Sequence, residues 1–209
     1  MPSIKWNKKM WTFGYKKFLE DPSNYQFYGE KWGNPEKNKS LKIIRAKFLT
    51  PFINENHTAL EIGPGGGRWT LYLLKFKRLY LLDLNNKFFP YLKKRFGDPQ
   101  NISYHQTNGT DFPNIPKNSV DFLFSFGTFV HLDQEIILEY LDNMKNILKE
   151  NSNVILNYSD MSKPQKFNKG FAYNTRAIMR KMITDNGYEI VSEDYKIHVT
   201  NLIHFKPTN

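Results

Sequence analysis

The hydrophobic pattern divides the chain into short apolar runs and longer amphipathic segments. The apolar runs, at residues 58–62, 78–83, 102–106, 120–126 and 154–158, are typical of buried strands. The amphipathic segments, at residues 40–52, 85–96, 135–148 and 174–186, have apolar positions at helical spacing. Two further runs, at residues 188–191 and 197–205, predict a final pair of strands. The pattern therefore predicts an α/β fold in which helices cover a mainly parallel sheet.

Length and composition are consistent with one globular unit. At 209 residues the chain is long enough to bury a sheet between two helical layers. It contains no cysteine, which excludes disulfides, cysteine-ligated zinc and thiol catalysis and is compatible with a reducing compartment. The first residues lack an apolar core of signal-peptide length, and no stretch approaches the length of a membrane span. We therefore expect a cytoplasmic protein without a membrane span.

A glycine-rich stretch follows the first predicted strand. Residues 60–70 read LEIGPGGGRWT, in which an apolar run breaks into glycines and then resumes as a helical pattern. Glycine permits left-handed backbone and close approach to a ligand, and a helix N-terminus adds free N–H groups, so we expect a ligand on this loop. The spacing G-x-G-x-G at Gly63, Gly65 and Gly67 does not match the dinucleotide pattern G-x-G-x-x-G, because Arg68 occupies the last position.

The second predicted strand indicates which ligand this is. It ends in Asp83, where a carboxylate at the tip of the neighbouring strand accepts hydrogen bonds from the two ribose hydroxyls of a nucleoside. The acidic-Gly-x-Gly-x-Gly motif at residues 61–67 and Asp83 together resemble the class I S-adenosylmethionine-dependent methyltransferases. The resemblance implies a Rossmann-like seven-stranded methyltransferase sheet with helices on both faces and an antiparallel final strand. It also implies S-adenosyl-L-methionine as cofactor and S-adenosyl-L-homocysteine as product.

The resemblance assigns a set of residues to the cofactor. Glu61 is expected to bind the methionine amino group or the loop backbone, and Asp83 the ribose. Arg68 is expected either to contact the methionine carboxylate or simply to lie at the start of the helix. The full set of expected cofactor-binding residues is Glu61, Gly63, Gly65, Gly67, Arg68, Asp83, Leu84, Asn108, Gly109 and Ser125.

One position departs from the family pattern. Alignment by residues 119–122 places Asn108 where the family usually has an aspartate that accepts from the adenine amino group, and Asp111 follows three residues later. The amide oxygen of Asn108 is also an acceptor. Three interpretations stay open: Asn108 contacts adenine, Asp111 does so, or Asn108 and Gly109 only form a turn.

The segment before the first strand is rich in aromatic residues. Disordered segments have few aromatics, so we expect an ordered N-terminal helical cap at residues 1–50, followed by the class I methyltransferase domain at residues 51–209. The cap either packs on the sheet as a structural element or acts as a lid over the active site. For the lid, Tyr25, Tyr28 and Trp32 are the expected substrate-binding residues.

The exit of the fourth strand carries the expected chemistry. In the resembled family this stretch runs under the sulfonium and the acceptor, so Phe129 is expected to bind substrate. Residues 60–70 and 125–132 look, more narrowly, like small bacterial O-methyltransferases associated with surface-glycan and natural-product sugars. An acceptor hydroxyl needs a base, and His131 is the candidate catalytic residue near the methyl group. The alternative role of His131 is to pack and shape the pocket.

The other histidines are expected away from the reacting atoms. His57 precedes the first strand at the wrong end of the sheet, whereas His105, His198 and His204 fall within predicted strands. No metal site is expected, because Asp160 stands alone after the fifth strand.

Charge and missing motifs limit the remaining functions. The net charge of +10 favours an anionic partner, or it only reflects lysines on exposed helix faces. The motif Asn/Asp-Pro-Pro-Tyr of amino methyltransferases acting on DNA and RNA is absent after the fourth strand, which favours oxygen over nitrogen as acceptor. We therefore expect O-methylation of a sugar or small polar metabolite. The alternative is an N-methyltransferase or RNA methyltransferase, and a non-catalytic cofactor-binding protein is less favoured because the glycine loop and Asp83 are intact. We expect a small-molecule or glycan substrate, not nucleic acid. The sequence does not indicate an oligomeric state.

Overall fold

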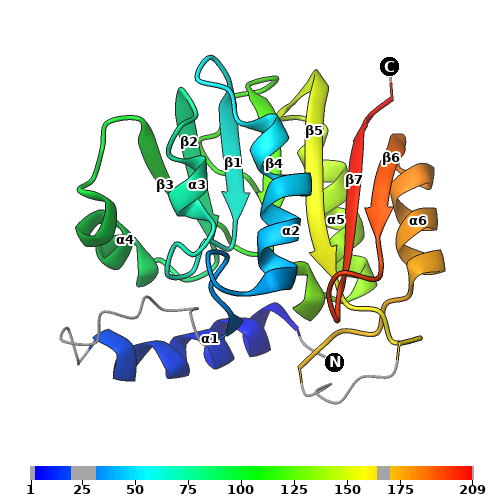
Figure 1. Ribbon diagram of the computed structural model, residues 1–209, viewed down its shortest axis with the longest axis horizontal. Coiled ribbons are helices and arrows are strands. Elements are labelled where there is room, and N and C mark those ends of the chain that lie inside the picture. The colour runs from blue at the N-terminus through cyan, green and yellow to red at the C-terminus, as the bar shows by residue number, and fades with distance from the viewer. Residues whose placement is uncertain (1–2, 20–31, 164–169, 209) are drawn as a thin grey trace.

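The computed structural model describes residues 3–19, 32–163 and 170–208, with the backbone alone for residues 12–19. Within these ranges seven strands form one sheet in the order β3-β2-β1-β4-β5-β7-β6 (Figure 1). The strands are β1 (Thr58–Ile62), β2 (Arg78–Asp83), β3 (Ile102–Gln106), β4 (Val120–Ser125), β5 (Leu148–Tyr158), β6 (Tyr188–Asp194) and β7 (Asn201–Pro207). Strands β1 to β5 are parallel, and β7 is antiparallel to both of its neighbours, β5 and β6. This confirms the predicted sheet and its antiparallel final strand.

Helices cover both faces of the sheet, as predicted. The helices α2 (Lys39–Phe48), α3 (Thr70–Leu73) and α4 (Phe88–Phe96) contribute to the core on one face. The helices α5 (Gln134–Met144) and α6 (Arg176–Asp185) contribute to the core on the other face. Two short 3₁₀ turns, Thr50–Phe52 and Phe129–His131, follow α2 and β4. No helix in the described ranges is long and apolar enough to cross a membrane.

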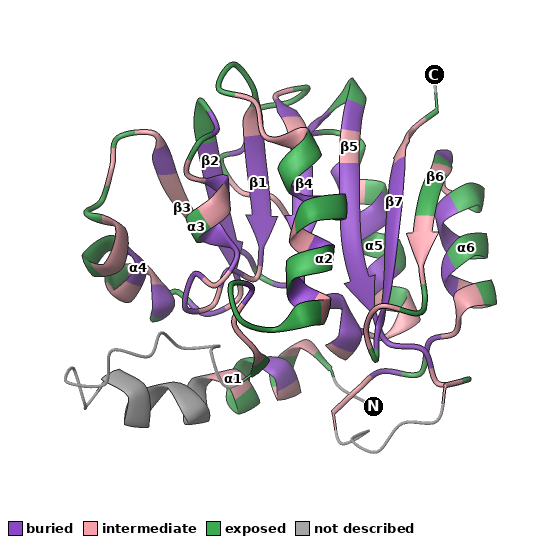
Figure 2. Cartoon of the chain, viewed as in Figure 1, coloured by how far each residue is buried: buried purple, intermediate pink, exposed green. Residues whose placement is uncertain are grey.

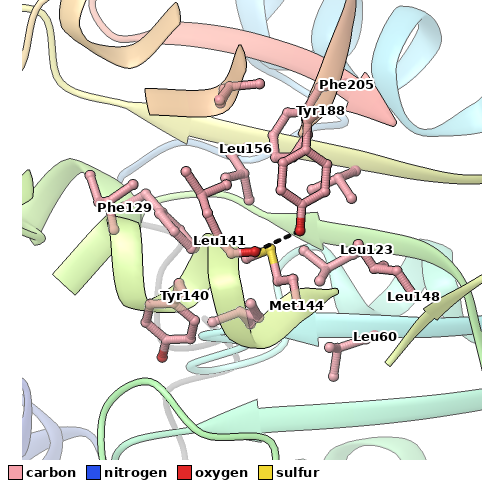
Figure 3. Close-up of a cluster of buried hydrophobic side chains, with 14 of the residues drawn as sticks. Leu60, Leu123, Phe129, Tyr140, Leu141, Met144, Leu148, Leu156, Tyr188 and Phe205 are labelled. Atoms are coloured by element: carbon pink, nitrogen blue, oxygen red, sulfur yellow. Dashed lines mark hydrogen bonds between the residues drawn. The ribbon is translucent and has the colours of Figure 1, made fainter. Parts of the chain in front are cut away.

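The inner strands β1, β2, β4, β5 and β7 contribute side chains to both cores, which explains why their apolar runs are nearly continuous. In β1, Leu60 and Ile62 join the core under α5 and α6, whereas Ala59 joins the core on the opposite face. Figure 2 shows the inner strands mostly buried, the edge strand β6 largely intermediate or exposed, and the outer surfaces of the helices exposed. In Figure 3 the Tyr188 hydroxyl donates to the carbonyl oxygen of Leu141 at 2.6 Å and so connects β6 with α5. A sheet buried on both faces reads as apolar throughout.

Helix boundaries follow local signals in the sequence. The side chain of Asn38 accepts a hydrogen bond from the N–H of Leu41 at 3.1 Å and caps α2. Gly97 ends α4 with φ +77°, the left-handed conformation that glycine adopts without strain. Helix α4 begins only at Phe88, so Pro90 lies in its first turn, where its missing N–H costs no helical hydrogen bond.

The start of β5 differs from the prediction. The strand predicted at residues 154–158 already begins at Leu148, where it pairs with Val120. The next paired residues are Phe122 and Asn153, so extra residues of β5 bulge between the two pairs. A polar stretch that suggests a turn in the sequence is here an irregular section of one long strand.

Helix α1 (Ile4–Leu19) lies across the carboxyl ends of the parallel strands (Figure 1). The Asn7 side chain donates to the carbonyl oxygen of His131 at 3.0 Å, just after β4. The side chain of Ile4 lies against Gly109, in the loop after β3. The N-terminal segment is thus packed on the edge of the sheet where open α/β proteins bind their ligands.

Candidate active site

The glycine loop joins β1 to α3 through three residues with positive φ. Gly63, Gly65 and Gly67 have φ values of +72°, +51° and +80°. A Cβ atom on Gly63 would lie 1.9 Å from Oγ1 of Thr128, and one on Gly67 would lie 2.6 Å from the ring of Phe96. Backbone conformation and close packing of the chain's own side chains therefore both require glycine here.

Asp83 ends β2 beside this loop. Its Oδ2 accepts from the N–H of Gly65 at 3.4 Å, and its Oδ1 accepts from the N–H of Asn85 at 2.8 Å. Burial raises the pKa of Asp83 to about 6, although these backbone hydrogen bonds act in the opposite direction. The carboxylate is mostly ionised at neutral pH, and each oxygen keeps a further lone pair for a ligand hydroxyl. Leu84 follows and is half-buried.

Glu61 lies beneath the loop and is buried. Its Oε2 accepts from the hydroxyl of Thr70, the first residue of α3, at 2.5 Å. Burial raises the pKa of Glu61 to about 8; the charge of Asp83 adds to the rise, and the hydrogen bond from Thr70 opposes it. Glu61 is therefore mostly protonated at neutral pH. Through this hydrogen bond Glu61 joins β1 to the helix after the loop. Its two expected roles were to bind the methionine amino group or the loop backbone, and this contact goes to a side chain instead of the loop backbone.

Arg68 connects the glycine loop to the N-terminal segment. Its Nη1 donates to the carbonyl oxygens of Trp32 at 3.0 Å and Gly33 at 3.4 Å. Its guanidinium carbon lies 5.3 Å from the centre of the Phe126 ring, at the exit of β4. Burial lowers the pKa of Arg68 to about 10, against the effect of the nearby Glu61. Arg68 forms no ion pair with the residues that the structure describes.

The loop after β3 distinguishes Asn108 from Asp111. One oxygen of Asp111 accepts from the hydroxyl of Thr107 at 2.6 Å and from the N–H of Asn108 at 2.8 Å, so this carboxylate closes the turn. The side chain of Asn108 is exposed. Gly109 has φ +146°, and a Cβ atom there would lie 2.4 Å from Cδ1 of Ile4 in α1. Asn108 thus has more capacity left for a ligand than Asp111.

Two residues expected at the site are buried in the protein. The hydroxyl of Ser125 donates to the carbonyl oxygen of Ile62 at 2.8 Å and joins the ends of β4 and β1. Phe129 is fully buried, and its ring packs against Tyr140 at 5.2 Å between centroids. The 3₁₀ turn after β4 directs Phe129 into the core, so in this structure the ring does not face an open pocket.

His131 lies where α1 meets the exit of β4. Its Nδ1 is 2.6 Å from the carbonyl oxygen of Gly170, and its ring centre is 4.8 Å from Trp11 and 5.4 Å from Phe171. A carbonyl oxygen only accepts, so Nδ1 carries the proton and Nε2 keeps a lone pair in the neutral ring. Burial lowers the pKa of His131, and the hydrogen bond to Gly170 opposes this shift. His131 is therefore neutral at pH 7.

The aromatic residues expected to contact substrate are only partly described. Tyr25 and Tyr28 lie outside the described residues. Trp32 is 44% exposed, and its ring meets Trp11 edge-on at 5.7 Å. Because Trp11 in turn contacts His131, an aromatic row leads from the surface to the histidine.

Some residues at this edge had not been singled out from the sequence. His198 was expected inside a strand, but it lies in the connection between β6 and β7, because β6 ends at Asp194 and β7 begins at Asn201. Its ring is 5.4 Å from Phe126, and its carbonyl oxygen accepts from Nζ of Lys163 at 3.3 Å. No periodicity marks such loop residues. Correct strand boundaries would have placed His198 at the carboxyl edge.

The described part of the chain also has hollows away from the carboxyl edge. Two hollows of about 610 and 540 Å³ lie at the opposite edge of the sheet, beside Asn118 and Lys149. Among the described residues no three His, Asp or Glu side chains lie together in a way that suits a metal ion. The carboxyl edge, with its carboxylates, glycines and histidine, is therefore the candidate active site.

Comparison with known proteins gives one family match. Residues 59–151, which run from β1 into β5, match a family described as a methyltransferase domain. No curated protein sequence matches the chain.

Several solved structures share the fold of this chain. An S-adenosylmethionine-dependent methyltransferase from Aquifex aeolicus is 20% identical over 90% of this chain and 95% of its own, with a TM-score of 0.65. The N-methyltransferase NodS from Bradyrhizobium japonicum WM9, in complex with S-adenosyl-L-homocysteine, is 16% identical over 84% and 91%, with a TM-score of 0.67. A geranyl diphosphate C-methyltransferase from Streptomyces coelicolor A3(2) is 13% identical over 80% and 78%, with a TM-score of 0.65.

The match of residues 59–151 supports the expected class, an S-adenosylmethionine-dependent methyltransferase, and the similar structures share its fold. The site fits this cofactor. Asp83 has acceptor capacity at the ribose position. There is also space between β4 and the glycine loop, because a Cβ atom on Gly127 would have Nη2 of Arg68, 3.9 Å away, as its nearest described neighbour. The acceptor stays open, because N- and C-methyltransferases are among the similar structures.

Proposed function

We propose that this enzyme methylates a hydroxyl oxygen of a sugar or another small polar metabolite, with His131 as general base. The observation that carries the proposal is the 2.6 Å contact between Nδ1 of His131 and the carbonyl oxygen of Gly170. This contact holds the imidazole beside the exit of β4 with Nε2 as proton acceptor. A hydroxyl must lose its proton during transfer, whereas a neutral amine already offers a lone pair, so a positioned base favours oxygen.

In this proposal the cofactor lies along the ends of β1, β2 and β3. Asp83 accepts from the ribose hydroxyls with the lone pairs that Gly65 and Asn85 do not use. Asn108, with its exposed side chain, accepts from the adenine amino group. Leu84 and Gly109 border the same region. Glu61 and Ser125 are buried and act as positioning residues, since one holds α3 and the other holds the end of β4.

The chemistry requires little beyond positioning and one proton transfer. S-adenosylmethionine supplies an activated methyl group: the acceptor oxygen bonds to its carbon as the carbon–sulfur bond breaks, and the sulfur keeps the electron pair. His131 takes the hydroxyl proton at Nε2, and the Gly170 carbonyl stabilises the resulting imidazolium through Nδ1–H. Trp11 and Phe171 hold the ring in place. Positioning of this kind lowers a barrier by about 7–11 kcal/mol at best.

The test uses pairs of acceptors that differ in one group, a sugar and the amino sugar that replaces one hydroxyl, with S-adenosylhomocysteine formation as readout. We expect transfer to the hydroxyl member. His131→Asn keeps a donor for the Gly170 carbonyl but removes the base, so kcat should fall about 10²–10⁴-fold. Calorimetric affinity for S-adenosylhomocysteine should stay within about twofold, because the variant leaves the cofactor residues intact.

His57→Asn is the matched control, because this histidine is exposed and precedes β1 at the opposite edge. It should have wild-type activity. Normal turnover by His131→Asn would refute the base. Transfer to the amino sugar alone, independent of His131, would replace the proposal by an N-methyltransferase. Because burial lowers the pKa of His131, the wild-type rate should hold as pH falls to about 6.5 and decline only below that value.

A further inference from the structure

Three segments bring basic side chains to the ring of Phe126. On one side the guanidinium of Arg68, from the glycine loop, lies 5.3 Å from the ring centre. On another side the imidazole of His198, from the β6–β7 connection, lies 5.4 Å away. Lys163, from the segment after β5, donates from Nζ to the carbonyl oxygen of His198 at 3.3 Å. We call Arg68, Phe126, Lys163 and His198 the basic cluster.

Arg68 has no counter-ion among the described residues. Its hydrogen bonds go from Nη1 to the carbonyl oxygens of Trp32 and Gly33, which are neutral. The acid that influences it is Glu61, whose pKa of about 8 leaves it mostly uncharged at neutral pH. The other terminal nitrogen, Nη2, faces the space beside Gly127. A half-buried cation of this kind gains stability from an anionic ligand.

Lys163 also forms no ion pair within the described part of the chain. Burial lowers its pKa, and the charges of Asp160 and Asp194 act against that shift. Asp160 accepts from Ser162, from both its N–H and its hydroxyl, and Asp194 pairs with Lys47 at 3.4 Å. Both acids thus have other donors, and Nζ of Lys163 bonds only a carbonyl oxygen.

His198 presents a neutral donor between the two cations. Nδ1 of His198 accepts from the N–H of Thr200 at 3.3 Å and lies 2.6 Å from the Thr200 hydroxyl oxygen. That oxygen accepts from the Asn157 amide, which leaves its own proton for Nδ1, so the proton of the neutral ring is on Nε2. The pKa of His198 is lowered to about 4, mainly by burial and in part by the charges of Arg68 and Lys163. The ring is therefore uncharged at physiological pH and offers Nε2–H as a hydrogen-bond donor.

We propose that the basic cluster binds an anionic group, a carboxylate or a phosphate, carried by the methyl acceptor. The donors are Nη2 of Arg68, Nζ of Lys163 and Nε2 of His198, which approach one region of the carboxyl edge from three segments. The inference rests on the proposed function, since it narrows its polar acceptor to an acidic or phosphorylated one. The cofactor also carries a carboxylate, and one expected role of Arg68 is to contact it. The experiment must therefore distinguish an anion of the acceptor from the carboxylate of the cofactor.

The test titrates inorganic phosphate, and acetate in parallel, into protein saturated with S-adenosylhomocysteine at low salt. Because the cofactor carboxylate is then already bound, any remaining anion site belongs to the acceptor. We expect wild type to bind at least one of the two anions, and Lys163→Gln to weaken this binding about tenfold or more. Affinity for S-adenosylhomocysteine should change less than about twofold in Lys163→Gln.

Lys145→Gln is the matched control, because this lysine is exposed, pairs with Asp142 and follows α5 at the opposite edge of the sheet. It should bind the anions like wild type. Absence of anion binding to the saturated wild type would overturn the inference. So would a tenfold loss of S-adenosylhomocysteine affinity in Lys163→Gln, which would assign the cluster to the cofactor. If S-adenosylhomocysteine itself does not bind wild type, the proposed function fails, and the inference fails with it.

Discussion

The carboxyl edge of the sheet has two halves that are built in different ways. The cofactor half comprises residues 61–68, 83–85 and 107–111. The acceptor half comprises α1 and residues 126–131, 159–163, 170–174 and 195–201. In the cofactor half most of these bonds join near neighbours: Asp83 and Asn85 are two residues apart, Glu61 and Thr70 nine, and Gly65 and Asp83 18. The bond from Arg68 to Trp32, across 36 residues, is the exception.

Contacts in the acceptor half span much greater separations. Asn7 reaches His131 across 124 residues, His131 reaches Gly170 across 39, and Lys163 reaches His198 across 35. Backbone groups and short loops position the first half, whereas the second half exists only when its five segments are packed together. Substitutions should therefore distinguish the halves. A change in the cofactor half should alter cofactor affinity, and a change in the acceptor half should alter turnover.

Asp83→Asn should have the largest effect on the cofactor half. The amide keeps an acceptor for the N–H of Asn85 but loses the charge, so affinity for S-adenosylhomocysteine should fall roughly 100-fold. Because the pKa of Asp83 is about 6, wild-type affinity should also decline as the pH drops through that value, when the carboxylate is protonated. Calorimetry at several pH values measures both effects.

The control for this prediction is Asp98→Asn, an exposed residue that pairs with Lys93. It should bind S-adenosylhomocysteine like wild type. Unchanged affinity in Asp83→Asn would show that the nucleoside does not lie at the end of β2.

Gly63→Ala tests the contact that joins the two halves. The alanine Cβ would meet the Thr128 hydroxyl oxygen of the acceptor half at 1.9 Å, whereas Gly97→Ala, with a similar φ of +77°, would meet nothing within 4 Å. Both variants bear the strain of a left-handed residue, so their difference measures the contact. Gly63→Ala should reduce the free energy of unfolding by about 1–3 kcal/mol more than Gly97→Ala in denaturant titrations. Equal losses would mean that Thr128 moves aside freely.

Trp11→Leu should have the smallest effect and should be limited to the acceptor half. Loss of the ring that lies against His131 loosens the base, so kcat should fall about tenfold while the affinity for S-adenosylhomocysteine is kept. Met10→Leu, at an exposed position one residue earlier, is the control and should match wild type. The reverse result, weaker S-adenosylhomocysteine binding with normal kcat, would place α1 with the cofactor half.

The residues that were predicted well are those with local causes. The apolar runs mark the strands because the sheet is buried on both faces, and Gly63, Gly65 and Gly67 mark the loop because each has a positive φ. Asp83 could be placed beside them because parallel neighbouring strands end at the same edge. Gly97 predicts the end of α4 for the same kind of reason.

Predictions that needed distant partners succeeded less well. Phe129 was expected to face the substrate, but the packing of α5 draws its ring against Tyr140. His198 was set aside because the boundaries of β6 and β7 cannot be read from a continuous apolar run. Asn108 and Asp111 were equivalent in the sequence, and the turn formed with Thr107 separates them.

The sequence alone determined the α/β fold, the glycine loop and the acid at the end of β2, because these depend on periodicity, backbone conformation and neighbouring strands. Only the tertiary structure decided which side chains meet at the acceptor half. His131 acquires its hydrogen-bonded form from Gly170 and its aromatic neighbour from α1, and Arg68, Lys163 and His198 converge only at the closed edge. Long-range packing creates these relations, and residue spacing along the chain does not encode them.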